Sequence, residues 1–212
     1  MAIDLERLSR TLSHALRHDP RQYGLNMDMK GWVQLDELLN ALREHKEEWA
    51  DLSREDIHHM VNDADKKRYE VNDEAIRALY GHSSRIRLEL EPVEPPQYLY
   101  LGTTYRNWNR IMKTGVKPQG RRYVHLSSEE QEAMDVALRA TRNPCMLIIL
   151  AGDAWKEGQE FYQATDKVWL TLYVPEQFVY ELVDDEEEQG GQEQTGDEAS
   201  SDQEADSSSE EN

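Results

Sequence analysis

A proline-rich joint divides the sequence into two stretches of different hydrophobic periodicity. The joint reads Glu91-Pro92-Val93-Glu94-Pro95-Pro96. Proline fixes φ and lacks a backbone N–H, so neither a helix nor a central strand is expected to continue through such a segment. We therefore expect an α+β chain of two lobes, with a first lobe over 1–90, a linker over 91–97 and a second lobe over 98–183.

Helical spacing dominates the first lobe. Apolar residues recur at this spacing in three segments, over 5–16, 35–42 and 57–64. Asp19-Pro20 ends the first segment, and Ser53 with Asp56 predicts a capping box at the start of the third. Short β-like stretches on either side of Asn72-Asp73 favour a hairpin. Three helices followed by a hairpin resemble a winged helix.

Short β-like stretches dominate the second lobe. They cover residues 98–103, 123–126, 145–150, 160–163, 168–174 and 178–183. Two helices interrupt them, one through Trp108 to Gly115 and one from Ser127-Ser128 to about Arg142. Helices inserted among short strands favour a compact α+β domain over an alternating parallel sheet.

The last 29 residues, 184–212, differ from both lobes because they contain no Lys or Arg and no apolar residue larger than Ala. Such a segment cannot bury enough surface to offset its ordering entropy, so we predict a disordered acidic tail. The tail holds 13 of the 43 acidic residues, so the other 183 residues carry 30 acids against 24 bases, a net charge near −6. This negative body argues against broad binding of nucleic acid but allows a local cationic pocket.

The compartment is predicted from the cysteine count and the apolar runs. Cys145 is the only cysteine, so no internal disulfide can form, which fits a reducing compartment. The first ten residues lack the profile of a signal peptide. The longest apolar run, over 146–151, is too short to cross a bilayer. We expect a cytoplasmic protein with no membrane association.

Common catalytic and metal-binding signatures are missing from the sequence. It contains no Gly-rich P-loop and no GxGxxG that opens a βαβ unit. His14 and His18 have the spacing of a two-histidine zinc site, but the segment reads His-Ala-Leu-Arg-His, without the glutamate of a metalloprotease. We therefore predict no metal site.

Arg and His residues at element boundaries are candidates for chemistry, and each also has a structural explanation. Arg17-His18 ends the first helix, where positive charge complements the helix dipole. Arg68 belongs to a basic cluster that could simply be solvated. Arg121-Arg122 precedes a strand on which His125 and Ser127 share one face. The structural explanation for this face is an edge strand with a polar outer side.

Taken together and in order, these segments resemble the KptA family of RNA 2'-phosphotransferases. In the first lobe the matching phrases are Leu12-Ser13-His14-Ala15-Leu16-Arg17-His18-Asp19-Pro20, Gly31-Trp32-Val33, Lys67-Arg68-Tyr69-Glu70-Val71 and Ile76-Arg77-Ala78-Leu79-Tyr80-Gly81-His82-Ser83. In the second lobe they are Gly102-Thr103, Val124-His125-Leu126-Ser127, Phe161-Tyr162-Gln163-Ala164, Val168-Trp169-Leu170-Thr171 and Val174-Pro175. The resemblance covers residues 3 to 182.

The resemblance implies an enzyme of tRNA processing that uses NAD as co-substrate. It would transfer the 2'-phosphate of an RNA to ADP-ribose, releasing nicotinamide and ADP-ribose 1'',2''-cyclic phosphate. It also implies a winged-helix-like, RNA-binding first lobe and an ADP-ribosyltransferase-like, NAD-binding second lobe. The implied catalytic residues are Arg17, His18, Arg68 and Arg121. The implied NAD-binding residues are Gly102, Thr103, His125, Leu126, Ser127, His82 and Ser83. A 2'-phosphorylated RNA is the expected partner, and no obligate protein partner is indicated.

Two departures from the family pattern affect the expected NAD site. The family strand usually reads Leu-Tyr-His-Gly-Thr, whereas here Leu101 stands where that histidine is expected. Asp166-Lys167 stands where Asn-Gly is common. Two alternatives remain open: ADP-ribosylation of a terminal nucleic-acid phosphate, or a non-catalytic winged-helix protein that binds nucleic acid, with Leu101 marking a lost NAD site.

Overall fold

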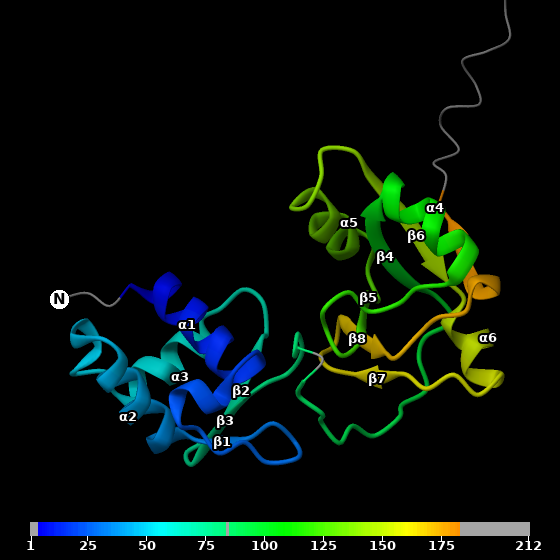
Figure 1. Ribbon diagram of the computed structural model, residues 1–212. Coiled ribbons are helices and arrows are strands. Elements are labelled where there is room, and N and C mark those ends of the chain that lie inside the picture. Colours follow the sequence, from blue (N-terminus) through cyan, green and yellow to red (C-terminus); the bar gives the residue numbers. More distant parts are fainter. Residues whose placement is uncertain (1–3, 84, 183–212) are drawn as a thin grey trace, which may run out of the picture. The chain divides into compact units, whose positions relative to one another are not determined.

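The computed structural model describes residues 4–83 and 85–182, all within one folded unit that ends at Leu182. It combines helices with two antiparallel sheets. The predicted disordered tail over 184–212 lies outside the described residues, as does the last position of the strand predicted over 178–183. Figure 1 shows the order of the elements along the chain.

The first lobe contains three α-helices and a small sheet. The helices are α1 (Leu5–Arg17), α2 (Leu35–His45) and α3 (Arg54–Asn62), and two 3-10 helices, η1 (Pro20–Tyr23) and η2 (Glu47–Trp49), follow α1 and α2. The strands β1 (Val33–Gln34), β2 (Tyr69–Val71) and β3 (Ala75–Ala78) pair antiparallel in the order β1-β3-β2. The three predicted helices and the hairpin are confirmed, whereas the two-residue strand β1 was too short to be predicted.

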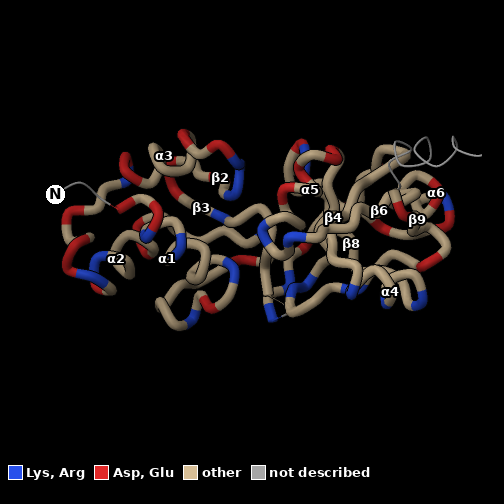
Figure 2. Tube along the Cα trace, turned by 90° about the horizontal axis from the view of Figure 1, so that it is seen from above, with Lys and Arg blue, Asp and Glu red and all other residues tan. Residues whose placement is uncertain are grey.

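Local side-chain contacts explain where these elements begin and turn. The Ser53 hydroxyl accepts a hydrogen bond from the Asp56 backbone N–H, and the Asp56 carboxylate accepts one from the Ser53 N–H, which is the predicted capping box. The Asn72 side-chain oxygen accepts hydrogen bonds from the backbone N–H groups of Glu74 and Ala75, which closes the hairpin between β2 and β3. Figure 2 shows acidic and basic positions interspersed along the helices of this lobe.

The second lobe is built on a six-stranded antiparallel sheet in the order β7-β8-β5-β4-β6-β9. The strands are β4 (Leu99–Thr104), β5 (Val124–Ser127), β6 (Pro144–Ile149), β7 (Tyr162–Gln163), β8 (Val168–Thr171) and β9 (Val179–Glu181). The helices are α4 (Tyr105–Thr114), α5 (Glu130–Leu138) and α6 (Ala151–Lys156), and the 3-10 helix η3 (Glu176–Phe178) precedes β9. All six predicted strands and both predicted helices are present.

Three details of the second lobe differ from the sequence-based expectations. The edge-strand interpretation of His125 and Ser127 is wrong, because β5 pairs with β4 on one side and β8 on the other. Helix α5 ends at Leu138 rather than near Arg142, because residues 139–143 form the turn into β6, which begins at Pro144. Helix α6 was not predicted because six residues are too few to show helical periodicity.

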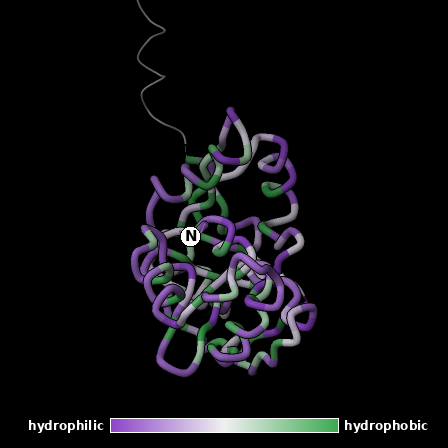
Figure 3. Tube along the Cα trace, turned by 90° about the vertical axis from the view of Figure 1, so that its left-hand side faces the viewer, coloured by the Kyte–Doolittle hydropathy of each residue, from purple (hydrophilic) through white to green (hydrophobic). Residues whose placement is uncertain are grey.

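Each lobe has its own hydrophobic core. The first core includes Leu12, Leu39 and Trp49, and the second includes Leu147, Phe161 and Trp169. No residue belongs to both clusters. Figure 3 shows short hydrophobic stretches separated by hydrophilic ones, and no helix among residues 4–83 and 85–182 is both long and apolar enough to span a membrane.

Candidate active site

The two lobes are joined by backbone contacts around Ser83. Its N–H donates to the carbonyl of Arg17 at the end of α1, with N···O 2.9 Å, and Ser83 also forms an isolated antiparallel bridge with Arg121. Next to this bridge, the Arg122 N–H donates to the His82 carbonyl at 3.0 Å. These contacts bring the end of α1 next to the segment that leads into β5.

Arg17 is held in place by aromatic side chains. Its guanidinium carbon lies 5.2 Å from the ring centre of Tyr69 and 5.3 Å from that of Tyr80, both cation–π distances. Gly81, with φ +89°, leaves room for this arrangement, because a Cβ there would lie 3.3 Å from the Arg17 side chain. Burial lowers the pKa of Arg17, and the positive charges of Arg68 and Arg121 lower it further. The Arg17 guanidinium also donates a hydrogen bond to the Arg68 carbonyl at 3.4 Å, so Arg17 belongs to a cluster with Arg68 and Arg121.

Arg68 and Arg121 line a pocket of about 220 Å³, which we call the cationic pocket. Its wall also contains Lys66, Arg139 and Lys167, and Glu132 is the only carboxylate among the lining residues. Within the described part of the chain, no ion pair engages Arg68, Arg121 or Arg139. An excess of positive charge in a small cavity favours an anionic ligand.

His125 projects from β5 into the cationic pocket with a defined tautomer. Its Nδ1 lies 3.0 Å from the carbonyl oxygen of Tyr123, and because a carbonyl only accepts, Nδ1 carries the proton. Burial and the neighbouring Arg121 lower the pKa of His125 to about 3, so the ring is neutral near pH 7. Nε2 is then a buried acceptor, and it has no hydrogen-bond partner among the described residues. It can accept a hydrogen bond from a ligand hydroxyl or N–H group.

The strand residues expected to bind NAD fall into two groups. Gly102, Leu126 and Ser127 line the cationic pocket beside His125, whereas Thr103 does not. Gly102 also has a structural role, because a Cβ there would lie 2.0 Å from the carbonyl oxygen of Ala133 in α5. Only glycine therefore allows α5 to pack this closely on β4.

Leu101, where the resemblance led us to expect a histidine, lines the cationic pocket as well. Its side chain is half-buried and packs against the core of the second lobe. Leucine offers neither a donor nor an acceptor, so this part of the wall can contact a ligand only through apolar surface.

Arg17, His18, His82 and Ser83 are not among the residues that line the cationic pocket. His18 caps the C-terminus of α1, and its pKa is lowered by partial burial and by His14, Arg17 and Arg121. His82 is buried, and burial together with Arg17 and His18 lowers its pKa to about 4. Both histidines therefore lie close to the arginine cluster, outside the pocket itself.

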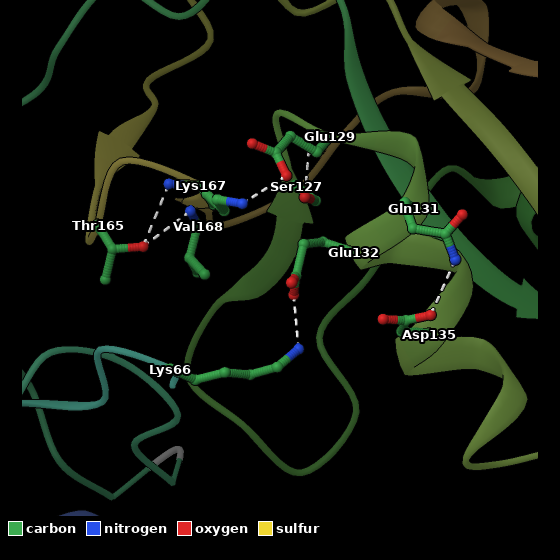
Figure 4. A network of polar contacts seen from close by, with 9 residues as sticks. All are labelled: Lys66, Ser127, Glu129, Gln131, Glu132, Asp135, Thr165, Lys167 and Val168. Atoms are coloured by element: carbon green, nitrogen blue, oxygen red, sulfur yellow. Dashed lines mark hydrogen bonds and ion pairs between the residues drawn. The ribbon is translucent and has the colours of Figure 1, made fainter. Parts of the chain in front are cut away.

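Sequence reasoning missed several charged residues of the cationic pocket. Figure 4 shows Lys66 reaching from the first lobe to Glu132 on α5, with Nζ 2.6 Å from the carboxylate. Lys167 forms a similar pair with Glu129 at 2.7 Å. Lys66 was noted in the sequence as part of the basic cluster around Arg68 and Lys167 as a departure from the family pattern, but neither was predicted to line a pocket. No group of three His, Cys, Asp or Glu side chains within 4–83 and 85–182 could hold a metal ion.

Comparison with known proteins identifies the family. A profile of the family described as "RNA 2'-phosphotransferase, Tpt1 / KptA family" matches residues 4–172. The chain belongs to this family. A relative from Acetivibrio thermocellus, named "Probable RNA 2'-phosphotransferase", is 45% identical over 177 residues, which cover 84% of this chain and 97% of the relative. Relatives of the same name from Bacillus thuringiensis subsp. konkukian and Thermococcus kodakarensis are 41% and 37% identical, and the matches cover 81% and 82% of this chain and 92% and 96% of these relatives.

Membership of the Tpt1/KptA family agrees with the resemblance found in the sequence. The matched residues include Arg17, Arg68 and Arg121 and all the strand residues that line the cationic pocket. The acidic tail lies beyond the matched part.

Proposed function

We propose that the chain is an NAD-dependent RNA 2'-phosphotransferase that acts on RNA of the tRNA splice-junction type. It would transfer the 2'-phosphate to ADP-ribose and release nicotinamide and ADP-ribose 1'',2''-cyclic phosphate. The observation that carries this proposal is the cluster of three arginines: Arg68 and Arg121 line the cationic pocket, and Arg17 lines a neighbouring groove together with Arg68. These arginines come from three separate segments of the chain, and no carboxylate pairs with them among the described residues.

The arginine cluster suits an RNA 2'-phosphate. This group is a monoester with a second pKa near 6, so it carries close to two negative charges at neutral pH. It is already a nucleophile and needs no general base. Guanidinium groups remain charged and bind phosphate oxygens bidentately. Arg68 and Arg121 are exposed enough to contact the phosphate, and Arg17, held against Tyr69 and Tyr80, supplies a further positive charge.

The other side chains of the cationic pocket fit part of an NAD molecule. The unpartnered Nε2 of His125 can accept a hydrogen bond from a ribose hydroxyl, and Lys167 and Arg139 can contact the pyrophosphate. A volume of about 220 Å³ is below the range of about 300–1,000 Å³ that is usual for whole ligands, so the pocket would enclose one nucleoside-sized part. NAD, when bound there, would supply ADP-ribose as the phosphate acceptor and nicotinamide as the leaving group.

The protein side chains would act mainly by positioning and by charge stabilisation. Holding the phosphate against its acceptor can contribute about 7–11 kcal/mol through effective molarity. Negative charge on the phosphoryl oxygens is greatest as the RNA oxygen departs, so the arginines should stabilise that stage most. His18 is the candidate acid for the departing oxygen. Its lowered pKa in the free protein would rise next to a bound phosphate dianion, because an opposite charge favours the protonated ring.

The proposed function assigns a role to each lobe. The first lobe, over 1–90, would be the winged-helix-like lobe that holds RNA. The segment over 91–97 would be the linker. The second lobe, over 98–183, would be the ADP-ribosyltransferase-like lobe that holds NAD through His125, Gly102 and Ser127, with Thr103, Leu126, His82 and Ser83 as further candidate contacts. The combination of three helices with a three-stranded antiparallel sheet supports the first assignment.

The proposal is tested by incubating the full chain with NAD and an RNA that carries one internal 2'-phosphate, followed by mass analysis of both products. We expect RNA with a free 2'-hydroxyl, together with nicotinamide and a cyclic phosphate of ADP-ribose, and no RNA product when NAD is omitted. A stable ADP-ribosylated RNA would instead favour transfer to a nucleic-acid phosphate. Failure to bind NAD in calorimetry would favour a non-catalytic RNA-binding protein.

A further inference from the structure

A second cavity, which we call the arginine pocket, adjoins the candidate active site. Its volume is about 700 Å³, and His18 forms part of its wall. Arg21 in η1 and two arginines on the segment after β3, Arg85 and Arg87, line the same cavity. None of these three arginines belongs to the cationic pocket.

The three guanidinium groups of the arginine pocket are available to a ligand. All three residues are exposed, and none takes part in an ion pair with another described residue. Two carboxylates also line the pocket, but backbone N–H groups engage them. Asp19 accepts a hydrogen bond from the Gln22 N–H, and Asp28 accepts from the N–H groups of Lys30 and Trp32. The carboxylates therefore organise the loops and do not pair with the arginines.

The groove between α1 and α3, about 560 Å³ in volume, provides a contrast. Its wall holds two ion pairs, Arg10 with Glu6 at 3.6 Å and His59 with Asp63 at 2.8 Å, and it also includes Arg17 and Arg68 of the arginine cluster. On a folded body whose net charge is negative, three unpaired arginines around one cavity stand out. They favour an anionic ligand in the arginine pocket.

Backbone hydrogen bonds fix the walls of the arginine pocket. The Leu25 N–H donates to the Pro20 carbonyl at 3.0 Å, which closes the turn that carries Arg21. The Glu89 N–H donates to the Met29 carbonyl at 2.8 Å, which ties the segment that carries Arg87 to the opposite loop. The pocket is thus formed before a ligand binds, which lowers the entropic cost of binding.

We infer that the arginine pocket holds the RNA strand next to the nucleotide that bears the 2'-phosphate. Arg21, Arg85 and Arg87 would contact backbone phosphates, and Met27, Met29 and Ile86 offer apolar surface for an unstacked base. His18 lies at the boundary, so a strand in this pocket leads directly to the arginine cluster. This inference rests on the proposed function, because it takes the 2'-phosphate to lie beside His18.

The test compares two ligands and two charge-matched triple variants of the full chain. The ligands are a short single-stranded RNA with a central 2'-phosphate and a single nucleoside 2'-phosphate that has no flanking nucleotides. The test variant is Arg21→Gln, Arg85→Gln and Arg87→Gln together. The control variant replaces three exposed arginines of the second lobe with glutamine. These are Arg106, Arg110 and Arg142, and none of them lines the arginine pocket.

Binding is measured by fluorescence anisotropy without NAD, at several salt concentrations. We expect the test variant to bind the RNA at least about tenfold more weakly, with a slope of log K against log salt that is shallower by about 2, since each phosphate contact with a single strand contributes about 0.7. Binding of the nucleoside 2'-phosphate should change less than about twofold, and the control variant should resemble the wild type.

The outcomes separate this inference from the proposed function. If the test variant binds the RNA like the wild type, the arginine pocket takes another ligand, such as an acidic protein segment, and the inference is overturned. Equal weakening in both triple variants would also overturn it, because general surface charge would then explain the effect. If the variants show the expected binding pattern but the wild-type protein does not remove the 2'-phosphate in the presence of NAD, only the proposed reaction is refuted.

Discussion

The two lobes hold their arginines of the candidate active site in different ways. Arg17, at the end of α1, is half-buried and lies between two tyrosine rings of the first lobe. Arg121, on the segment before β5, is exposed and has no ion-pair partner among the described residues. The packed side chain of Arg17 therefore contributes to the stability of the fold as well as to the site. The exposed side chain of Arg121 contributes mainly by contacting a ligand.

The largest effect is expected from removing the exposed cation. If Arg121 stabilises the phosphoryl group during transfer, Arg121→Gln should lower kcat/KM for a 2'-phosphorylated RNA by about 10²–10³-fold, as is usual for a lost transition-state donor. The free energy of unfolding should change by less than about 0.5 kcal/mol, since the residue lies on the surface. Rates come from single-turnover assays and stability from urea unfolding.

Arg17→Gln sharpens the comparison between the two arginines. It should lower the activity as well, but it should also destabilise the protein, because the packing with Tyr69 and Tyr80 is lost. Arg106→Gln, a change at an exposed residue that does not line the cationic pocket, serves as the control. Wild-type activity in Arg121→Gln would show that the arginine cluster does not bind the phosphate.

The histidines of the two lobes offer a second comparison, based on pH. Burial lowers the pKa of His82 to about 4 and that of His125 to about 3, below the value of about 6.5 in an unfolded chain. The stability that each neutral ring contributes is present above about pH 6.5 and is lost as the pH falls towards the folded pKa. At about pH 5 only the unfolded state binds the proton, so each histidine should lower the free energy of unfolding by about 2 kcal/mol.

Single variants measure how much each histidine contributes to the loss of stability at acidic pH. In His125→Gln, the loss of stability between about pH 7.5 and pH 5 should be smaller than in the wild type by about 2 kcal/mol, and His82→Gln should behave alike. Urea unfolding at constant ionic strength measures this difference. A variant whose stability falls with pH in parallel with the wild type would mean that its histidine is protonated in the folded state.

The parts of the fold that could be predicted are those set by local sequence. The helical period that ends at Asp19-Pro20 and the capping box at Ser53 depend on neighbouring residues, and both are present in the structure. The position of β5 inside the sheet depends on its pairing with β4 and β8, which are distant in the sequence. For that reason the edge-strand interpretation of His125 failed, although the strand itself was predicted.

The candidate site also combines features set by local sequence with features set by contacts between distant segments. The individual arginines could be named from the sequence and the family resemblance, but the tyrosine packing around Arg17 arises only when the end of β3 meets α1. Glu132 and Arg139 gave no signal at all, because acidic and basic residues on a surface helix are common. Their contribution depends on α5 packing closely on β4 at Gly102.

A further prediction concerns the apolar wall that the second lobe presents at Leu101. If NAD occupies the cationic pocket, Leu101→His adds a hydrogen-bonding group and should tighten binding about two- to twelvefold, the usual range for one neutral hydrogen bond. Leu101→Ala is the matched control, since it removes the leucine side chain without adding a donor. Calorimetric titration with NAD measures both variants, and an unchanged dissociation constant in Leu101→His would place the cofactor elsewhere.

The smallest effect is expected from the ion pair between the lobes, Lys66 and Glu132. Their side chains are 32% and 31% exposed, so solvent screens the attraction despite the 2.6 Å distance. A double-mutant cycle with Lys66→Met and Glu132→Gln should give a coupling energy below about 1 kcal/mol, decreasing with salt. The pair Lys167–Glu129, within the second lobe, is the matched comparison and is more exposed, at 53% and 47%. A coupling energy of several kcal/mol for Lys66 and Glu132, with a small one for Lys167 and Glu129, would mean that this pair holds the lobes together. The separate cores would then be less independent than their packing indicates.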